Sequence, residues 1–287
     1  MTKIACVVEA HDTLGESCFW CPITRRVWWL DILKPSLQCF DPVKREHQVY
    51  RLPARLCGCV VPRKSGGFVL ATENGLHGFD PSNIWLQYLL HVEPNEPENR
   101  YNDGRCDRRG RLWIGTMDVE LRRPSGTFYR IGPDRSVAAQ FDSITVPNST
   151  CFSPDDRTLY FADSPRHAIW AFDFDIDAGM ISNRRVFADL TGRKGLPDGS
   201  CIDAQGYLWN AEYAGRRLTR YTPDGRVDRT IELPVTNPTC CCFGGDNLDT
   251  LYVTSAAQRL PEPAPIEGAL LALDVGVRGL PEAAFGG

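Results

Sequence analysis

Short apolar runs recur along the chain, separated by turns rich in Gly, Pro and Asp. Each run is followed, after a second turn, by another apolar segment that usually closes on an aromatic residue with Asp or Pro. Runs of roughly four to eight residues bounded by such turns predict strands. The six pairs of segments are 27–31 with 37–42, 68–71 with 76–81, 112–115 with 126–131, 159–163 with 169–173, 208–211 with 218–221, and 251–254 with 270–274.

The spacing of these pairs predicts the architecture. Successive gaps are 41, 44, 47, 49 and 43 residues when the anchors are Trp28, Val69, Trp113, Tyr160, Trp209 and Tyr252. A period in the forties, made of short strands, is typical of β-propeller blades, whereas helical repeats need long amphipathic segments that this chain lacks. We therefore predict an all-β, six-bladed β-propeller that forms a single domain over residues 1–287. The additional apolar segment 4–9 is expected to complete the last blade and so close the ring.

Composition and charge exclude several classes of function. Hydrophobic residues make up 43% of the chain and charged residues 24%, and the net charge is −4. This balance attracts the protein neither to nucleic acid nor to anionic membranes. No apolar run approaches the ~18 residues of a membrane span, and the N-terminal segment is too short and acidic for a signal peptide. We therefore expect a cytoplasmic protein.

Twelve cysteines suggest either disulfides or a zinc cluster. In a reducing compartment, free buried thiols are the expected state. Cys18 with Cys21 and Cys57 with Cys59 supply four thiols, but the two pairs lack the spacing of zinc modules. The sequence therefore favours free thiols.

Three turns that precede core strands share a tight-turn formula of Asp with Gly or Pro. In each, an Asp side chain can accept hydrogen bonds from the backbone of its own turn. We interpret all three as purely structural. They are 107–110, 154–157 and 203–206.

Oxygen-bearing side chains recur at one position relative to the anchors. Four repeats have Glu, Asn or Asp 11 or 12 residues before the anchor, and the other two have Cys or Gly there. If this position begins the innermost strand of each blade, the symmetry of the ring directs these side chains toward the central channel. The four residues are Glu16, Asn102, Asn148 and Asp198.

Two carboxylates and two amide oxygens around one axis are the ligands that a hard divalent cation prefers. Buried carboxylates without a cation would be costly. The alternative is that each residue only forms a turn, because Asn and Asp are common in loops. Arg100, two residues before Asn102, could donate hydrogen bonds to a substrate. Asp103 has the character of a structural carboxylate bonded to backbone.

Several motifs, in order along nearly the whole chain, resemble the gluconolactonase/regucalcin-like (senescence-marker) family. They are L-G-E at 14–16, R-x-N-D-G at 100–104, L-W-x-G-T-M at 112–117, Asn148 before F-S-P-D at 152–155, L-Y-F-A-D-S at 159–164, S-N-R-R at 182–185, P-D-G at 197–199 and C-C-F-G-G at 241–245.

The resemblance implies a six-bladed propeller that holds one divalent metal in its channel and hydrolyses sugar lactones. It implies that Glu16, Asn148 and Asp198 bind the metal, which could be Ca²⁺, Zn²⁺, Mn²⁺, Mg²⁺ or Fe²⁺. It also implies that Arg100 and Asn102 bind substrate hydroxyls.

This chain departs from the family pattern at a few positions. Ser17 and Ser149 stand where Gly usually follows the Glu and the metal-binding Asn. The loop 118–125 is short, and either Glu120 or an Arg such as Arg122 takes the place of the Glu that contacts substrate in animal members. Glu120 is the residue that we predict there.

The leading hypothesis is therefore a metal-dependent enzyme of carbohydrate catabolism that opens an aldonolactone to its aldonic acid, with Asp198 as both metal ligand and general base. The alternatives are a metal-dependent esterase or phosphotriesterase that uses the same pocket, and a non-enzymatic calcium-binding or scaffold propeller. The sequence leaves the sugar, the metal and the oligomeric state open.

Overall fold

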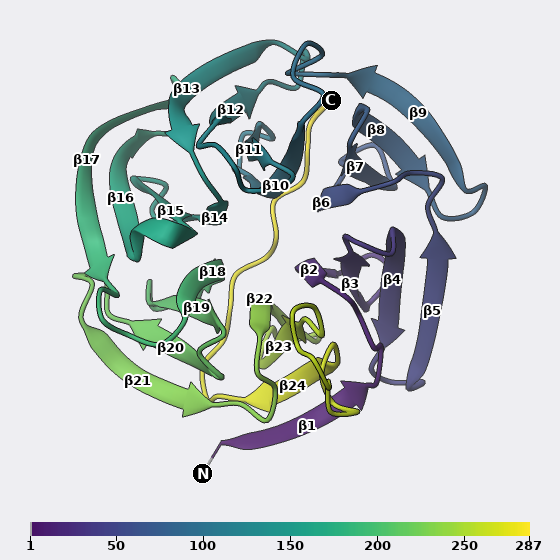
Figure 1. Ribbon diagram of the computed structural model, residues 1–287, viewed down its shortest axis with the longest axis vertical. Helices are drawn as coiled ribbons and strands as arrows, with labels where there is room; N and C mark the ends of the chain where they lie inside the picture. The colour runs from purple at the N-terminus through teal and green to yellow at the C-terminus, as the bar shows by residue number, and fades with distance from the viewer. Residues whose placement is uncertain (1) are drawn as a thin grey trace.

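The computed structural model describes residues 2–287 and consists of six four-stranded antiparallel sheets arranged in a ring (Figure 1). Blades 1 to 3 comprise β2 (Gly15–Cys21), β3 (Arg26–Asp31), β4 (Ser36–Asp41) and β5 (Glu46–Arg51); β6 (Cys57–Pro62), β7 (Phe68–Thr72), β8 (Gly75–Asp80) and β9 (Trp85–Leu90); and β10 (Asn99–Cys106), β11 (Leu112–Asp118), β12 (Gly126–Ile131) and β13 (Val137–Ile144).

Blades 4 to 6 follow in the same order around the ring. They comprise β14 (Pro147–Phe152), β15 (Thr158–Asp163), β16 (Ala168–Asp175) and β17 (Met180–Asp189); β18 (Leu196–Ile202), β19 (Leu208–Tyr213), β20 (Arg217–Tyr221) and β21 (Val227–Glu232); and β22 (Pro238–Gly244), β23 (Thr250–Ser255), β24 (Leu270–Asp274) and β1 (Lys3–Val8). One short 3₁₀ helix, η1 (Ser164–Arg166), follows β15. No helix within residues 2–287 has the length and apolar character of a membrane span.

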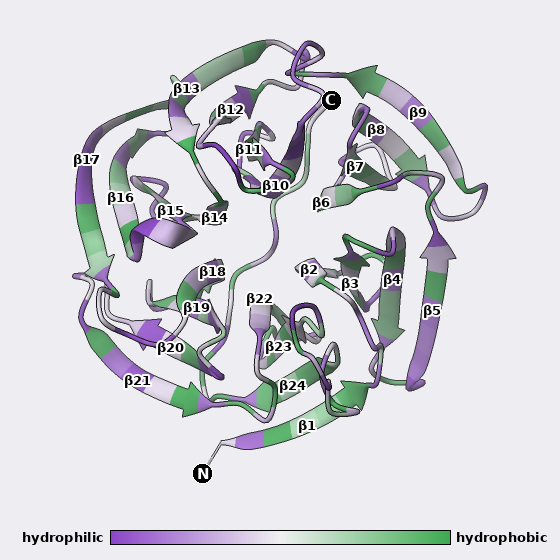
Figure 2. Cartoon of the chain, in the orientation of Figure 1, coloured by the Kyte–Doolittle hydropathy of each residue, from purple (hydrophilic) through white to green (hydrophobic). Residues whose placement is uncertain are grey.

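The predicted six-bladed propeller is confirmed. The predicted anchors all lie on the second strand of their blades, and the segments paired with them form the third strands. The N-terminal strand β1 pairs antiparallel with β24, so the sixth blade combines the two ends of the chain, as expected. The outermost strands β5, β17 and β21 are mostly exposed and carry hydrophilic residues along much of their length (Figure 2).

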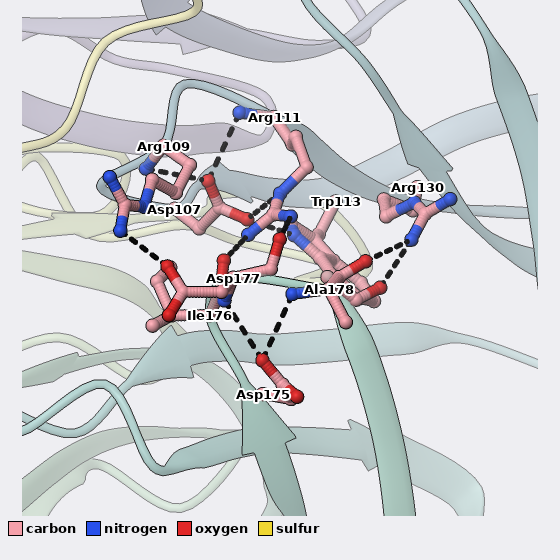
Figure 3. A network of polar contacts seen from close by, with 10 residues as sticks. Asp107, Arg109, Arg111, Trp113, Arg130, Asp175, Ile176, Asp177 and Ala178 are labelled. Atoms are coloured by element: carbon pink, nitrogen blue, oxygen red, sulfur yellow. Dashed lines mark hydrogen bonds and ion pairs between the residues drawn. The ribbon is translucent and has the colours of Figure 1, made fainter.

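Aromatic residues of several second strands are buried between the blades, and in blades 3 and 5 the Asp of the preceding turn bonds the Trp of that strand. Asp107 accepts a hydrogen bond from Trp113 Nε1 at 2.9 Å and from Arg111 Nε at 2.6 Å. Arg111 also donates to the hairpin of blade 4, and Arg109 pairs there with Asp177 (Figure 3). The Asp turn thus orients the core Trp of its own blade and a guanidinium that joins the next blade. The structural interpretation of this turn is confirmed.

The C-terminal segment crosses one end of the channel, from blade 6 to the gap between blades 2 and 3 (Figure 1). It bonds to turns that follow the inner strands: Ala204 N donates to Arg278 O at 2.8 Å and Gly286 N to Gly110 O at 2.9 Å. Phe285 is buried there. Because these turns lie where the inner strands end, the other end of the channel, where the inner strands begin, is the end that remains open to a ligand.

All twelve cysteines are free thiols in the described chain, and eleven of them are buried. The sulfur atoms of Cys201 and Cys241, on neighbouring inner strands, lie 3.5 Å apart. Burial raises the pKa of the Cys201 thiol, which keeps it protonated and unreactive at neutral pH.

Candidate active site

The four residues in register lie on inner strands, near the strand starts. Glu16 is on β2, Asn102 on β10, Asn148 on β14 and Asp198 on β18. The pairing of every inner strand with its neighbour shifts register at this position or directly after it. A β-bulge re-aims the side chains beside it. The repeated bulge therefore explains why these polar side chains turn into the channel instead of into a sheet interface.

Two of the bulges need a left-handed residue, and serine supplies it. Ser17 has φ 57° and Ser149 has φ 59°. Ser17 Oγ accepts a hydrogen bond from Val60 N of the next blade at 3.0 Å. Ser149 Oγ donates to the Asp198 carbonyl at 2.6 Å. These interblade bonds offset the cost of about 1 kcal/mol or more that a left-handed conformation imposes on a residue with a Cβ.

A cavity of about 350 Å³ opens over these residues. Glu16, Arg100, Asn102, Asn148 and Asp198 all line it. Apolar side chains form much of the remaining wall, chiefly Leu14, Leu33, Leu56, Met117, Val119 and Leu121. A pocket of this size, with apolar walls and a few convergent polar groups, is typical of a small-molecule site.

A chain of hydrogen bonds connects blades 3, 4 and 5 beneath the cavity. Arg100 Nη1 donates to Asn102 Oδ1 at 2.6 Å, and Asn102 Nδ2 lies 3.3 Å from Asn148 Oδ1. Asn148 Nδ2 donates to Ser164 Oγ at 2.8 Å, and Ser164 Oγ donates to Pro197 O at 2.7 Å. Ser164 thus engages the amide nitrogen of Asn148, so the Asn148 oxygen is the atom that remains for Asn102 Nδ2 and for a cation.

The carboxyl groups of Glu16 and Asp198 interact directly, and this interaction raises the pKa of Asp198. Burial is the largest cause that raises the pKa of Glu16 to about 8, with the charge of Asp103 adding to it. The pKa of Asp198 is raised well above its usual range, first by burial and then by Glu16. Without a cation, the pair therefore retains a proton at neutral pH.

The guanidinium of Arg100 is the positive group beside this pair. Burial lowers the pKa of Arg100 to about 10, while Glu16 and Asp198 act in the opposite direction. One guanidinium does not neutralise two carboxylates, so a hard divalent cation fits the oxygen donors of Glu16, Asn148 and Asp198. Within residues 2–287, no group of three or more His, Cys, Asp and Glu side chains is placed to hold a metal ion. The site described here has two carboxylates, and its third oxygen donor is the amide of Asn148.

Asp103 and Glu120 lie outside the cavity. Asp103 accepts a hydrogen bond from Thr150 N at 2.6 Å, so it bonds backbone as expected, although it does so from strand β10 to the neighbouring blade rather than within a turn. Glu120 is exposed on the loop after β11, and the cavity is lined instead by its neighbours Val119 and Leu121. Arg122 is also exposed and pairs with Glu98.

Sequence reasoning missed four polar residues that line the cavity. Ser164 ends the L-Y-F-A-D-S motif at 159–164, but the motif alone assigns it no role. Tyr213 ends β19, and Gln258 and Arg259 lie in the loop between β23 and β24. No repeat spacing leads to these last two, because the loop lengths differ between blades.

Comparison with known proteins identifies close relatives. Residues 14–257 match the family model described as SMP-30/Gluconolactonase/LRE-like region. Regucalcin of Xenopus laevis is 36% identical over 296 residues, and 6-deoxy-6-sulfogluconolactonase of Pseudomonas putida is 33% identical over 289 residues; each alignment covers 99% of both chains.

Solved structures agree in fold. The crystal structure of a calcium-binding protein, regucalcin, from Agrobacterium tumefaciens superimposes with a TM-score of 0.94 at 31% identity, covering 99% of this chain and 97% of that one. A gluconolactonase of Xanthomonas campestris, at 23% identity and a TM-score of 0.79, covers 95% of this chain and 89% of that one and shares the fold. The chain therefore belongs to the SMP-30/gluconolactonase/LRE-like family.

Proposed function

We propose that the protein is a metal-dependent sugar lactonase that opens an aldonolactone to its aldonic acid, in carbohydrate catabolism in the cytoplasm. The observation that carries the proposal is the pair of buried carboxyl groups, Glu16 and Asp198, beside the Asn148 oxygen in a cavity that also contains Arg100. The 6-deoxy-6-sulfogluconolactonase among the relatives supports lactone chemistry.

Glu16, Asn148 and Asp198 would hold the divalent cation. When bound, such a cation polarises an ester carbonyl and acidifies water. Asp198 is the candidate general base, because its carboxylate faces the cavity and can accept the proton of an attacking water. Arg100 and Asn102 would orient the sugar hydroxyls and stabilise the negative charge that develops on the carbonyl oxygen.

A direct assay tests this function. Lactone opening releases acid, so a pH indicator follows it over a panel of five- and six-carbon aldonolactones, with and without EDTA. We expect opening of at least one aldonolactone and loss of that activity on chelation. An aryl ester and a phosphotriester in the same panel test the alternative hydrolase, which the apolar cavity wall favours. Calcium binding without turnover of any substrate would point instead to a binding protein.

Replacing Arg100 by Ala should lower turnover about 10²-fold while metal stays bound, because one donor to the developing oxyanion is lost. Arg100 is no ligand of the cation, so metal affinity measured by calorimetry should change little. Steady-state kinetics and the melting temperature separate this effect from misfolding. A folded variant with wild-type turnover would exclude Arg100 from the reaction.

A further inference from the structure

The cavity has a second group of polar side chains, separate from the inner-strand residues. Tyr213 comes from blade 5, and Gln258 and Arg259 come from the loop between β23 and β24 in blade 6. The proposed reaction assigns no role to any of the three. In contrast, the lining contributed by blades 1 to 3 beyond their inner strands is apolar, including Leu33, Leu56 and Met117.

Tyr213 lines the same cavity as the two carboxylates and this arginine, and the charges of all three act on it. Burial raises the pKa of Tyr213, the charge of Arg259 acts in the opposite direction, and the charges of Asp198 and Glu16 raise it further. Its hydroxyl is buried and meets no partner of hydrogen-bond geometry within residues 2–287, although the Gln258 side chain lies beside it. Buried polar atoms are normally paired, so an unpaired one in a ligand cavity points to a ligand atom.

The loop that carries Arg259 is held in place by its backbone. Ala257 N donates to Asp12 O and Gln258 N to Thr13 O, both at 3.0 Å. Asn237 Nδ2 donates to Gln258 O at 3.3 Å. Arg259 itself has φ 62°, a left-handed conformation that costs a residue with a Cβ about 1 kcal/mol or more. These constraints place the start of the Arg259 side chain at the cavity independently of any ligand.

The two arginines that line the cavity differ in whether nearby carboxylates balance their positive charge. Arg100 bonds to Asn102 and faces the charges of Glu16 and Asp198. The guanidinium of Arg259 has no ion pair and no hydrogen bond to any residue in the described part of the chain. Arg259 is an exposed residue at the cavity, and no ion pair within residues 2–287 offsets its charge, so an anionic group that enters the cavity is attracted to it.

We propose that Tyr213, Gln258 and Arg259 form a subsite for an anionic group on the substrate, so that the lactone carries a sulfonate, phosphate or carboxylate remote from its ester carbonyl. This inference rests on the proposed lactonase function and names its substrate class. Arg259 pairs with the anion, while Tyr213 and Gln258 donate hydrogen bonds to it. The subsite thereby directs the uncharged ester end toward Asp198 and Arg100.

The test compares gluconolactone with 6-phosphogluconolactone, which differ only in the anionic group. The measured quantity is the ratio of kcat/KM for the phosphorylated lactone to kcat/KM for the neutral one. Arg259→Gln should lower this ratio about 10- to 100-fold, the scale of one hydrogen-bonded ion pair. Tyr213→Phe should lower it less, because only a hydroxyl is lost. In wild type the ratio should decrease as the salt concentration is raised from about 0.02 M to about 0.5 M. In Arg259→Gln this decrease should be smaller.

Arg135→Gln is the matched control. Arg135 is exposed, has φ 66°, and lies in the hairpin between β12 and β13, outside the cavity. Its substitution removes one surface charge from the same backbone conformation and should leave the ratio unchanged. An equal ratio in Arg259→Gln and wild type, or an equal fall in Arg135→Gln, would overturn the subsite.

Binding separates this inference from the lactonase proposal. Calorimetry with gluconate and 6-phosphogluconate, the two ring-opened acids, needs no turnover. Tighter binding of 6-phosphogluconate by wild type, lost in Arg259→Gln, supports the subsite even if no lactone is opened. Turnover of gluconolactone without any discrimination between the two acids would refute the subsite and leave the lactonase proposal intact.

Discussion

Replacing Asp198 by Asn should reduce lactone opening by about 10³-fold or more while leaving the protein folded. The substitution keeps the side-chain volume but removes a charged metal ligand and the candidate base together, and general-base catalysis alone accounts for about 10² to 10⁴ in rate. The metal-free protein should become no less stable, because the change removes a buried carboxyl that interacts unfavourably with Glu16. Steady-state kinetics and thermal unfolding of the chelated protein measure the two effects.

Asp203 offers the matched control, since it is a second buried carboxylate just beyond the same strand. It accepts hydrogen bonds from Trp209 Nε1 at 3.0 Å and from Arg220 Nη2 at 2.6 Å, so it holds the core. Asp203→Asn should therefore lower the melting temperature while the remaining folded protein keeps its specific activity. If Asp198→Asn is folded and opens lactones at the wild-type rate, Glu16, Asn148 and Asp198 are structural residues only.

The fold could be predicted because each blade repeats one physical solution. A buried residue at the centre of the second strand recurs at nearly constant spacing, so the number of blades follows from the sequence. In blades 3 and 5 this residue is a Trp, Trp113 or Trp209, and the Asp of the preceding turn bonds its indole nitrogen. The additional apolar segment near the N-terminus was expected to pair with the open edge of the last blade, and β1 does pair with β24 there.

The inner-strand part of the site was predictable for the same reason. Glu16, Asn148 and Asp198 share one register, and a ring directs equivalent positions toward its axis. The role of Ser17 was not predictable, since the sequence shows only that Ser stands where the family usually has Gly. The structure shows that this serine keeps the left-handed conformation and uses its hydroxyl to bond the next blade.

The loop residues could not be placed from the sequence, because loops follow no repeat. Glu120 precedes a left-handed residue, Leu121, and the turn leaves Glu120 exposed while both neighbours line the cavity. The loop that carries Arg259 is anchored by Asp12 and Thr13, in the segment between β1 and β2, which is a contact between parts of the chain that are far apart in sequence. Spacing within a single repeat carries no information about either arrangement.

Removing the metal should abolish activity and make stability fall as pH rises from about 4.5 to about 8. The pKa of Glu16 is raised from 4.5 to about 8 in the folded metal-free protein, and that of Asp198 is raised as well. A group with a raised pKa binds its proton more tightly when folded, so its stabilisation is complete below the unfolded pKa and is lost as pH rises through the folded pKa. Melting temperatures in EDTA at several pH values measure this slope.

Added divalent cation should cancel much of this slope, because it takes the place of the proton between Glu16 and Asp198. At a free concentration about 100 times its Kd, a ligand stabilises the folded state by about 2.7 kcal/mol, which corresponds to about 4 °C in a domain of this size. Burial raises the pKa of Asp12 to about 7, and Asp12 lies outside the cavity. Asp12 therefore makes stability fall with rising pH both with and without metal. The melting temperature with cation minus that in EDTA, taken at each pH, therefore isolates the contribution of Glu16 and Asp198. This difference should grow with pH in wild type and should be smaller in Glu16→Gln. A difference that is independent of pH, or absent with Ca²⁺, Mn²⁺, Mg²⁺, Zn²⁺ and Fe²⁺ alike, would show that these carboxylates hold no cation.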